Sequence, residues 1–242
     1  MIKLYTIKKI FILLFVTFVV CTAAQSRPTL EFSFDYNCLT ACQSEIDFTG
    51  NGLLAGARIG KIEKKVSSPA GLGASTSVFL GSPSKGLDLG VGTSVSYNTF
   101  SKCFMDGKEE KVEGGYVLSF TAGPALRYTF VTHTSLYFCP GIRFNIQDLR
   151  AEMSTLGKIH YKEKNIMVNF SCGVRQWFFS TGKTGIGIDA GADLAFPINS
   201  ISTVNYTIPG GGDASESYKV TSGRLLKFYL GMCFNLGNRT TE

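Results

Sequence analysis

Charged side chains recur at every second position in several segments of this chain, between bulky apolar neighbours. Because opposite charges on one face of paired strands form ion pairs, Arg175 and Asp189 are expected to face each other across the short 181–184 link. Buried, such charges must be paired. Two interpretations stay open: a structural network that fills an interior, or a polar path or ligand site lined by arginine. The charged residues of this pattern are Arg58, Asp88, Arg127, Arg143, Arg175, Asp189, Asp193 and Lys227.

The cysteines offer a second kind of chemistry. Cys38 and Cys42 have a C-x₃-C spacing, and a local disulfide between them is predicted if the chain reaches an oxidising compartment. A zinc site would need two further ligands near this pair, and the sequence supplies none there. We therefore expect neither a metal nor a cofactor.

Nucleophilic catalysis has little support in the sequence. The chain has two histidines, and we expect His133 in a short turn and His160 in a long loop. No nucleophile elbow, zinc-protease motif or phosphate-binding loop occurs. We therefore predict no catalytic residues. A membrane-bound acyl hydrolase that uses His160 with a loop serine is the least favoured alternative.

The elements that carry these residues show strict alternation with a period of two, which is typical of β-strands. In the segment 87–97, for example, leucine, valine and tyrosine alternate with aspartate, glycine and serine. One face of the strand therefore carries the bulky apolar residues, and the other face carries small and charged residues. The segments predicted as strands are 53–62, 71–80, 87–97, 116–130, 136–146, 165–180, 186–196 and 226–236.

The links between these segments predict how the strands are arranged. Two short links at 131–134 and 181–184 alternate with long links at 98–114, 147–163 and 198–222. Short turns on one rim and long loops on the other are typical of an up-and-down membrane barrel. A soluble lipocalin-like barrel or β-sandwich is the alternative. The membrane barrel is favoured because glycine and serine dominate the polar face, whereas lysine and glutamate gather in the links.

The first 24 residues have the layout of a cleavable signal peptide for Sec export: Lys3, Lys8 and Lys9, an apolar run over 10–20, and small residues at 22–24. Without the three lysines the formal charge falls from +6 to +3. This weak basicity does not favour nucleic-acid binding.

The strand count leaves one segment over. Residues 28–36 also alternate, which would give nine strands, whereas single-chain bacterial barrels have even numbers. We therefore predict an all-β, antiparallel up-and-down barrel of eight strands over 51–237. An extension over 25–50 would precede it, and an overhang over 238–242 would follow it. A ten-stranded barrel is the alternative.

The last segment carries a family resemblance. Leu230, Gly231, Phe234 and Leu236 form a hydrophobic-Gly-x-x-aromatic-x-hydrophobic pattern, which looks like the signal read by the barrel-assembly machinery. With the strand pattern and the leader, the chain resembles the small bacterial outer-membrane barrels of the OmpX, OmpW and OmpA-barrel type. It departs from them because the family's terminal phenylalanine is absent.

This resemblance implies the bacterial outer membrane as the location, with its lipids and the assembly machinery as partners. Together with the missing catalytic motifs, it favours a non-enzymatic barrel with a filled lumen. Its loops would bind host or environmental surface ligands. An OmpW-like conduit for small solutes, hydrophobic ones included, is the alternative.

Overall fold

The computed structural model describes residues 29–47, 61–80, 86–131, 133–153, 157–181, 184–207, 213–216 and 219–236. The predicted signal peptide over 1–24, Arg58 and the overhang over 238–242 lie outside these ranges. No helix that is long and apolar enough to cross a membrane is found among the described residues.

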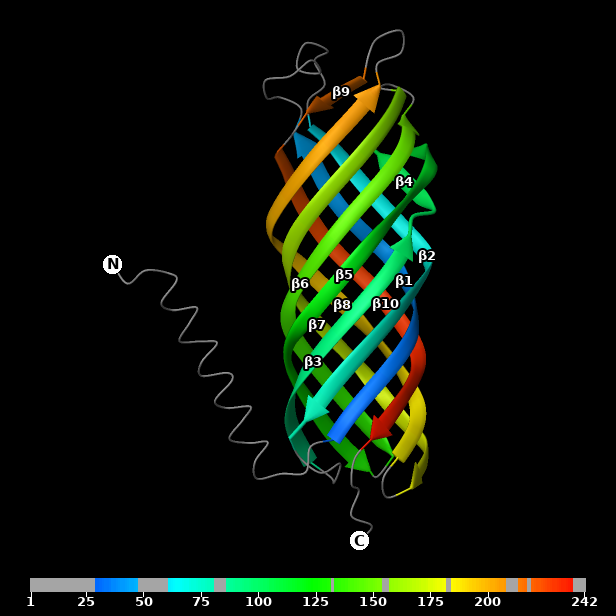
Figure 1. The fold of residues 1–242 in the computed structure, drawn as a ribbon, viewed down its shortest axis with the longest axis vertical. Helices are drawn as coiled ribbons and strands as arrows, with labels where there is room; N and C mark the ends of the chain where they lie inside the picture. Colours follow the sequence, from blue (N-terminus) through cyan, green and yellow to red (C-terminus); the bar gives the residue numbers. More distant parts are fainter. Residues whose placement is uncertain are drawn as a thin grey trace, which may run out of the picture.

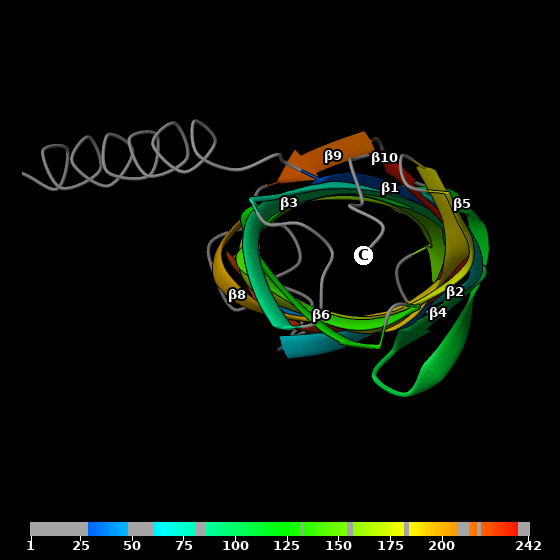
Figure 2. The same ribbon diagram turned by 90° about the horizontal axis from the view of Figure 1, so that it is seen from below.

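The described chain forms a tall, closed barrel of antiparallel strands (Figures 1 and 2). A ring of eight hydrogen-bonded strands makes the wall, so the predicted all-β barrel is confirmed. The ring strands are β1 (Thr29–Asp47), β2 (Lys61–Phe79), β3 (Gly86–Thr99), β5 (Lys108–Val131), β6 (Thr134–Met153), β7 (Gly157–Thr181), β8 (Thr184–Thr207) and β10 (Lys219–Leu236). Two short strands, β4 (Lys102–Met105) and β9 (Asp213–Glu216), lie near the upper rim as drawn in Figure 1.

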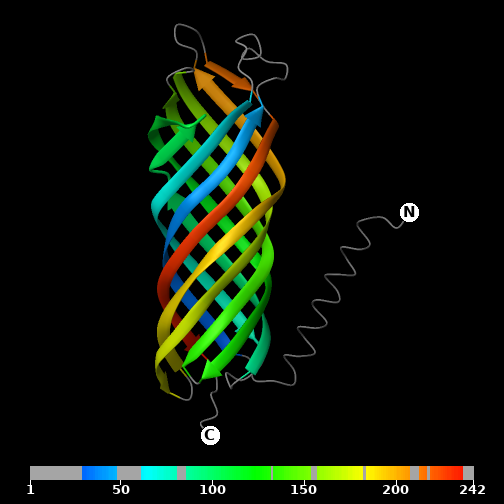
Figure 3. The ribbon, with the colours of Figure 1, turned by 180° about the vertical axis from the view of Figure 1, so that it is seen from behind.

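The N-terminal segment is part of the wall, which corrects the predicted extension over 25–50. Strand β1 pairs with β10 from Leu30↔Leu236 and with β2 from Thr29↔Phe79, so it closes the ring (Figure 3). Its alternating pattern does form a strand. It is needed in the wall because closure removes the exposed edges that the first and last strands would otherwise leave.

The even strand count is recovered because the described end of one predicted strand continues into the next predicted strand. Strand β2 runs from Lys61 to Phe79, so residues 61–62 and the segment 71–80 belong to the same strand, apart from Leu80 at its end. The rest of the segment 53–62 lies outside the described residues. Residues 63–69, which lie between the predicted strands 53–62 and 71–80 and were expected to be a link, contain Pro69, which breaks a simple strand pattern. Pro69 instead lies beside an irregularity in the β1–β2 register, where a strand tolerates proline.

The predicted long loops are largely strand, which is a further correction. Strands β6 and β7 stay paired from Met153↔Gly157 to Thr134↔Gln176, so most of the link at 147–163 belongs to the wall. Within 98–114, β4 and β5 form a hairpin around Asp106 and Gly107. Both of these residues have positive φ, as a tight hairpin turn requires. In the view along the barrel, this hairpin projects from the wall (Figure 2).

The barrel is therefore much taller than a membrane. At about 3.3 Å per residue and a tilt near 45°, a strand such as β7 with its 25 residues rises roughly 55–60 Å, about twice the ~25 Å of an apolar membrane band. On the long strands the exposed large apolar residues occupy only the lower part, from Ile166 downward on β7 and from Phe144 downward on β6. We call this lower zone the apolar belt and the part above it the upper half.

Candidate functional site

The interior of the barrel is the candidate site, because it contains every predicted charged residue that the structure describes. Asp88, Arg127, Arg143, Arg175, Asp189, Asp193 and Lys227 all come from inward-facing positions on β3, β5, β6, β7, β8 and β10. On each strand these positions alternate with outward apolar residues, so the period of two brings the charges together. The structure arranges them in a lower and a middle layer.

Glu31 lies at the centre of the lower layer. Its two carboxylate oxygens accept hydrogen bonds from Nη1 of Arg127 and Nη1 of Arg175. Arg127 also donates to Asp88, with its Nη2 2.7 Å from Oδ2. Arg175 donates to Asp189 across the β7–β8 hairpin, with Nε 3.2 Å from Oδ2, as the sequence spacing predicted. One carboxylate from β1 thus joins two arginine–aspartate pairs into a network.

Aromatic rings seal this lower layer. The Arg127 guanidinium lies 4.3 Å from the centre of the Phe79 ring, and that of Arg175 lies 4.4 Å from the centre of the Tyr137 ring. The Tyr137 hydroxyl donates to Asp189 at 2.8 Å. These contacts leave the arginines 1–3% exposed. The rings and the ion pairs fill the lumen at this level.

The middle layer is built around Asp193. Its Oδ2 lies 2.9 Å from Nζ of Lys227 and 3.2 Å from Nη1 of Arg143. Arg143 uses its remaining donors on neutral oxygens, including that of Asn169 at 3.0 Å and that of Asn145 at 3.1 Å. The layer therefore has no described cation without a carboxylate partner.

A third cluster lies higher in the lumen and was not predicted. Lys64 Nζ lies 3.3 Å from Glu163 Oε2 and 3.2 Å from Gln147 Oε1, and it packs 3.5 Å from the centre of the Tyr161 ring. The side chains of Lys64 and Glu163 are both 0% exposed. Around this pair the lumen is apolar, with Leu39, Ile46, Val66, Val117, Leu149, Ile159, Met167 and Leu225 in one buried cluster.

Three charged residues of the lumen were not predicted from the sequence, and the reason is the same for all of them. Glu31 belongs to the segment assigned to an extension, and Lys64 and Glu163 belong to segments assigned to links. The alternation of Glu31 and Ser33 with apolar residues was visible in the sequence, and placing that strand in the ring would have found the central carboxylate. Lys64 and Glu163 carried a weaker signal, because their outward neighbours are also charged.

The predicted Cys38–Cys42 disulfide is wrong. Cys42 faces the lumen and is buried, Cys38 occupies an outward position, and both thiols are free. Positions four residues apart on an extended strand are separated by roughly 13 Å, whereas disulfide-bonded Cα atoms lie about 4.4–6.8 Å apart. Higher in the barrel, burial raises the pKa of the Cys103 thiol on β4 to about 11, so this thiol stays protonated and unreactive at neutral pH.

The histidines do not form a hydrolytic site with serine among the described contacts. His133 occupies the predicted short turn, and its carbonyl accepts a hydrogen bond from the Trp177 amide. His160 lies on β7 and not in a loop, with its Nε2 2.9 Å from Oδ1 of Asp148 on the outer wall. No group of three or more histidine, cysteine, aspartate or glutamate side chains that could hold a metal ion occurs in the described part.

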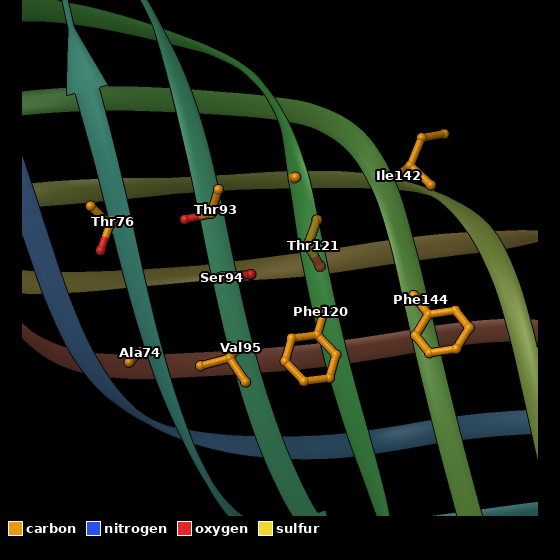
Figure 4. Close-up of a pocket in the computed structure, with 10 residues that line it drawn as sticks. Ala74, Thr76, Thr93, Ser94, Val95, Phe120, Thr121, Ile142 and Phe144 are labelled. Carbon is orange, nitrogen blue, oxygen red and sulfur yellow. The ribbon is translucent and has the colours of Figure 1, made fainter.

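The outer wall has a hollow of about 570 Å³ within the apolar belt (Figure 4). Short side chains such as Ala74, Thr76 and Thr93 form it, and Phe120 and Phe144 lie beside them. The lining supplies hydroxyl groups but no charged or histidine side chain. This hollow is therefore a depression in the apolar surface without the groups that catalysis needs.

The predicted assembly signal lies on β10, the last strand of the barrel. Leu230 and Leu236 face outward from the belt, and Gly231 faces inward opposite Asp35 of β1. A Cβ at Gly231 would lie 2.1 Å from the carbonyl oxygen of Phe34, so the close contact at the closing seam requires glycine.

Comparison with known proteins gives the same fold. No family model matches the sequence, and no curated protein matches it. Among solved structures, the outer membrane protein OprG from Pseudomonas aeruginosa matches with a TM-score of 0.56 and 11% identity, over 87% of this chain and 96% of that one. The outer membrane protease OmpT from Escherichia coli matches with a TM-score of 0.52 and 7% identity, over the same shares of the two chains. At these identities the likeness is one of fold, and this chain therefore has the fold of the small antiparallel β-barrels of bacterial outer membranes.

Proposed function

We propose that this chain is a non-enzymatic barrel of the bacterial outer membrane, exported through the Sec pathway. In this proposal the filled lumen is a rigid support, and the upper half is a binding surface outside the cell. The rim where β1 begins and β10 ends faces the periplasm. The short connections after β5 and β7 lie at that same rim (Figure 1).

The filled lumen is the observation that carries this proposal. Each described lysine and arginine of the lumen lies within 3.3 Å of a carboxylate oxygen. Above these layers, the buried apolar cluster closes the upper lumen around Lys64 and Glu163. An eight-stranded barrel has an interior just wide enough for side chains to fill. A paired, packed interior supports a structural role better than a solute path.

The upper half has the surface that partner binding needs. Its outer wall carries charges of both signs, and the β4–β5 hairpin, which also pairs with β2, contributes several of them: Lys102, Asp106, Lys108, Glu109 and Glu110. Host or environmental surface ligands with mixed charge would suit this hairpin. Since the strands are rigid, such a ligand meets a preformed surface.

Conductance and adhesion together test the proposal. The full mature chain in planar bilayers should show no channel events above the lipid background, whereas an open conduit would conduct or take up small hydrophobic solutes. Cells that produce the protein should adhere to a panel of matrix and host surfaces. Replacing the exposed charges Lys108 and Glu109 by serine should reduce that adhesion at unchanged outer-membrane abundance. Conduction by the wild type, with adhesion unaffected by the replacement, would favour the conduit.

A further inference from the structure

The outer face of β7 carries a row of basic side chains directly above the apolar belt. Its outward positions are Lys158, His160, Lys162 and Lys164, and the next outward residue below them is Ile166. Between Lys164 and Ile166, which are successive outward positions of β7, the side chain changes from lysine to isoleucine. Lys162 and Lys164 are therefore the basic residues of β7 nearest the lipid.

Carboxylates offset only part of this charge. Glu113 pairs with Lys158 at 3.1 Å, away from the belt. Asp148 on β6 lies 2.9 Å from His160 and 4.0 Å from Lys162. Among the described carboxylates, none lies within ion-pair distance of Lys164. The positive excess is therefore greatest at the edge of the belt.

A hollow of about 450 Å³ lies at this edge, between β5, β6 and β7. Lys162, Lys164 and Asp148 supply its charged outward side chains, and Tyr116 and Ile146 supply its apolar lining. Gln147 and Glu163 also border the hollow, but both are buried toward the lumen, where Glu163 pairs with Lys64. Tyr116 stacks on Tyr97, with their ring centres 5.6 Å apart. Such aromatic side chains are typical of the level where lipid headgroups meet the apolar core. Above, the outward side chains of the hollow are two lysines and one aspartate that already faces His160, and below they are apolar, which matches the polarity of an anionic lipid.

We propose that this hollow binds the phosphate-bearing headgroup of a lipid in the surrounding leaflet. The ammonium groups of Lys162 and Lys164 contact the phosphate, and Tyr116 and Ile146 contact the first apolar part of the lipid. The site rests on the proposed membrane insertion but not on the proposed adhesion. A lipid source fits better than a free anion, because the hollow opens outward at the belt and has an apolar side that a free anion would not use.

Lipid binding to the full mature chain in neutral detergent micelles tests this site. The probe is diphosphorylated lipid A, counted on the folded barrel by native mass spectrometry, with dephosphorylated lipid A as the comparison. Lys162→Gln with Lys164→Gln should weaken binding of the phosphorylated probe roughly thirtyfold, given the usual contribution of each lysine near an anionic surface. The matched control is Lys65→Gln with Lys111→Gln, two exposed lysines of β2 and β5, and it should leave binding unchanged.

Three results would overturn the site: an equal loss in the control variant, equal binding of the dephosphorylated probe, or displacement of the lipid by millimolar inorganic phosphate. The last of these would indicate a free-anion site. Heat-modifiable migration on gels shows separately whether each variant has formed the barrel. A wild-type chain that shows no heat-modifiable migration would contradict the proposed membrane barrel itself. A folded wild-type chain that does not bind the lipid would contradict only this site.

Discussion

The apolar belt and the upper half are built from the same eight strands but have opposite polarity. In the belt, β6 and β7 hold isoleucine, valine and phenylalanine outside and charged or small residues inside. In the upper half, the same strands hold lysine, arginine and glutamate outside, and Leu149, Ala151 and Ile159 inside. On β6 and β7 the alternation continues without a break, and only the chemical class at each parity changes. On β1, β2 and β5 the register is irregular between the two regions. The surroundings outside the wall therefore decide which residues a strand needs on each face.

The two regions also bury charge in different ways. In the belt, Glu31, Arg127 and Arg175 belong to a network with several acceptors for each donor. In the upper half, Lys64 and Glu163 form one described ion pair within an apolar cluster, and Tyr161 and Asn165 donate hydrogen bonds to Glu163. When one member is lost, the network in the belt keeps other described ion pairs, whereas this pair in the upper half does not. The predictions below test this difference.

The largest effect is expected from Glu31→Ala. This change removes the carboxylate shared by Arg127 and Arg175, and each arginine keeps only one aspartate. Breaking a buried ion pair typically costs about 3–5 kcal/mol, and here two pairs are affected. We therefore expect the free energy of unfolding to fall by about 5 kcal/mol, measured by urea unfolding in lipid vesicles.

The matched control for Glu31 is Glu152, which pairs with Lys111 at 3.2 Å on the outer wall of the upper half. Both side chains are well exposed, so Glu152→Ala should cost less than about 1 kcal/mol. Similar losses for the two alanine variants would mean that the lumen is hydrated and that its charges are screened like those on the surface.

The second prediction concerns the single pair. Lys64→Met should lower the free energy of unfolding by about 3–4 kcal/mol, because it removes the described ion pair of the buried Glu163 carboxylate. Adding Glu163→Gln should restore most of this loss, since the uncompensated charge is gone. In the belt, Arg175→Ala with Asp189→Ala should restore much less, because Glu31 also loses a partner. Equal recovery in both double variants would contradict the distinction between pair and network.

The sequence predicted the belt well and the upper half poorly. Segments such as 87–97 and 136–146 show bulky apolar residues against glycine, serine and charge, and this contrast marks both the strand and its lipid face. In the upper half the contrast is weaker, because outward lysines alternate with inward residues of mixed type such as Ile159, Tyr161 and Glu163. Such a stretch resembles a polar loop when its neighbours are unknown.

The inward charges on paired strands could be predicted where a short turn fixes the register. Arg175 and Asp189 meet this condition, and the structure pairs them. The contact of Arg175 with Glu31 could not be predicted in the same way, because 144 residues separate the two in sequence and only ring closure brings them together. Local spacing thus gives the pairs, whereas the network depends on the closed barrel.

The third prediction tests the change of polarity on one strand. Ile142→Lys places a charge on the lipid side of β6 within the belt and should cost about 2–3 kcal/mol. Arg150→Val on the same face of β6, but in the upper half, should change the free energy of unfolding by less than about 0.5 kcal/mol. Urea unfolding in vesicles measures both. If the two changes had equal effects, the belt would not end between these positions.

The smallest effect concerns titration on the outer wall of the upper half. Glu113 accepts a hydrogen bond from Lys158 and attracts its charge, and together these effects raise the pKa of that lysine above its ordinary value. A raised pKa in the folded barrel means that this contact stabilises the fold below the unfolded pKa, and that the stabilisation is lost as pH rises through the folded value. Glu113→Gln should lower the Lys158 pKa, as read from NMR titration of labelled lysine side chains, whereas Glu109→Gln on the β4–β5 hairpin should not. Because Lys158 is fully exposed, the change in unfolding free energy should be too small to detect, in contrast to the buried Lys64. If the Lys158 pKa did not change in Glu113→Gln, the contact between Lys158 and Glu113 would not be populated in solution.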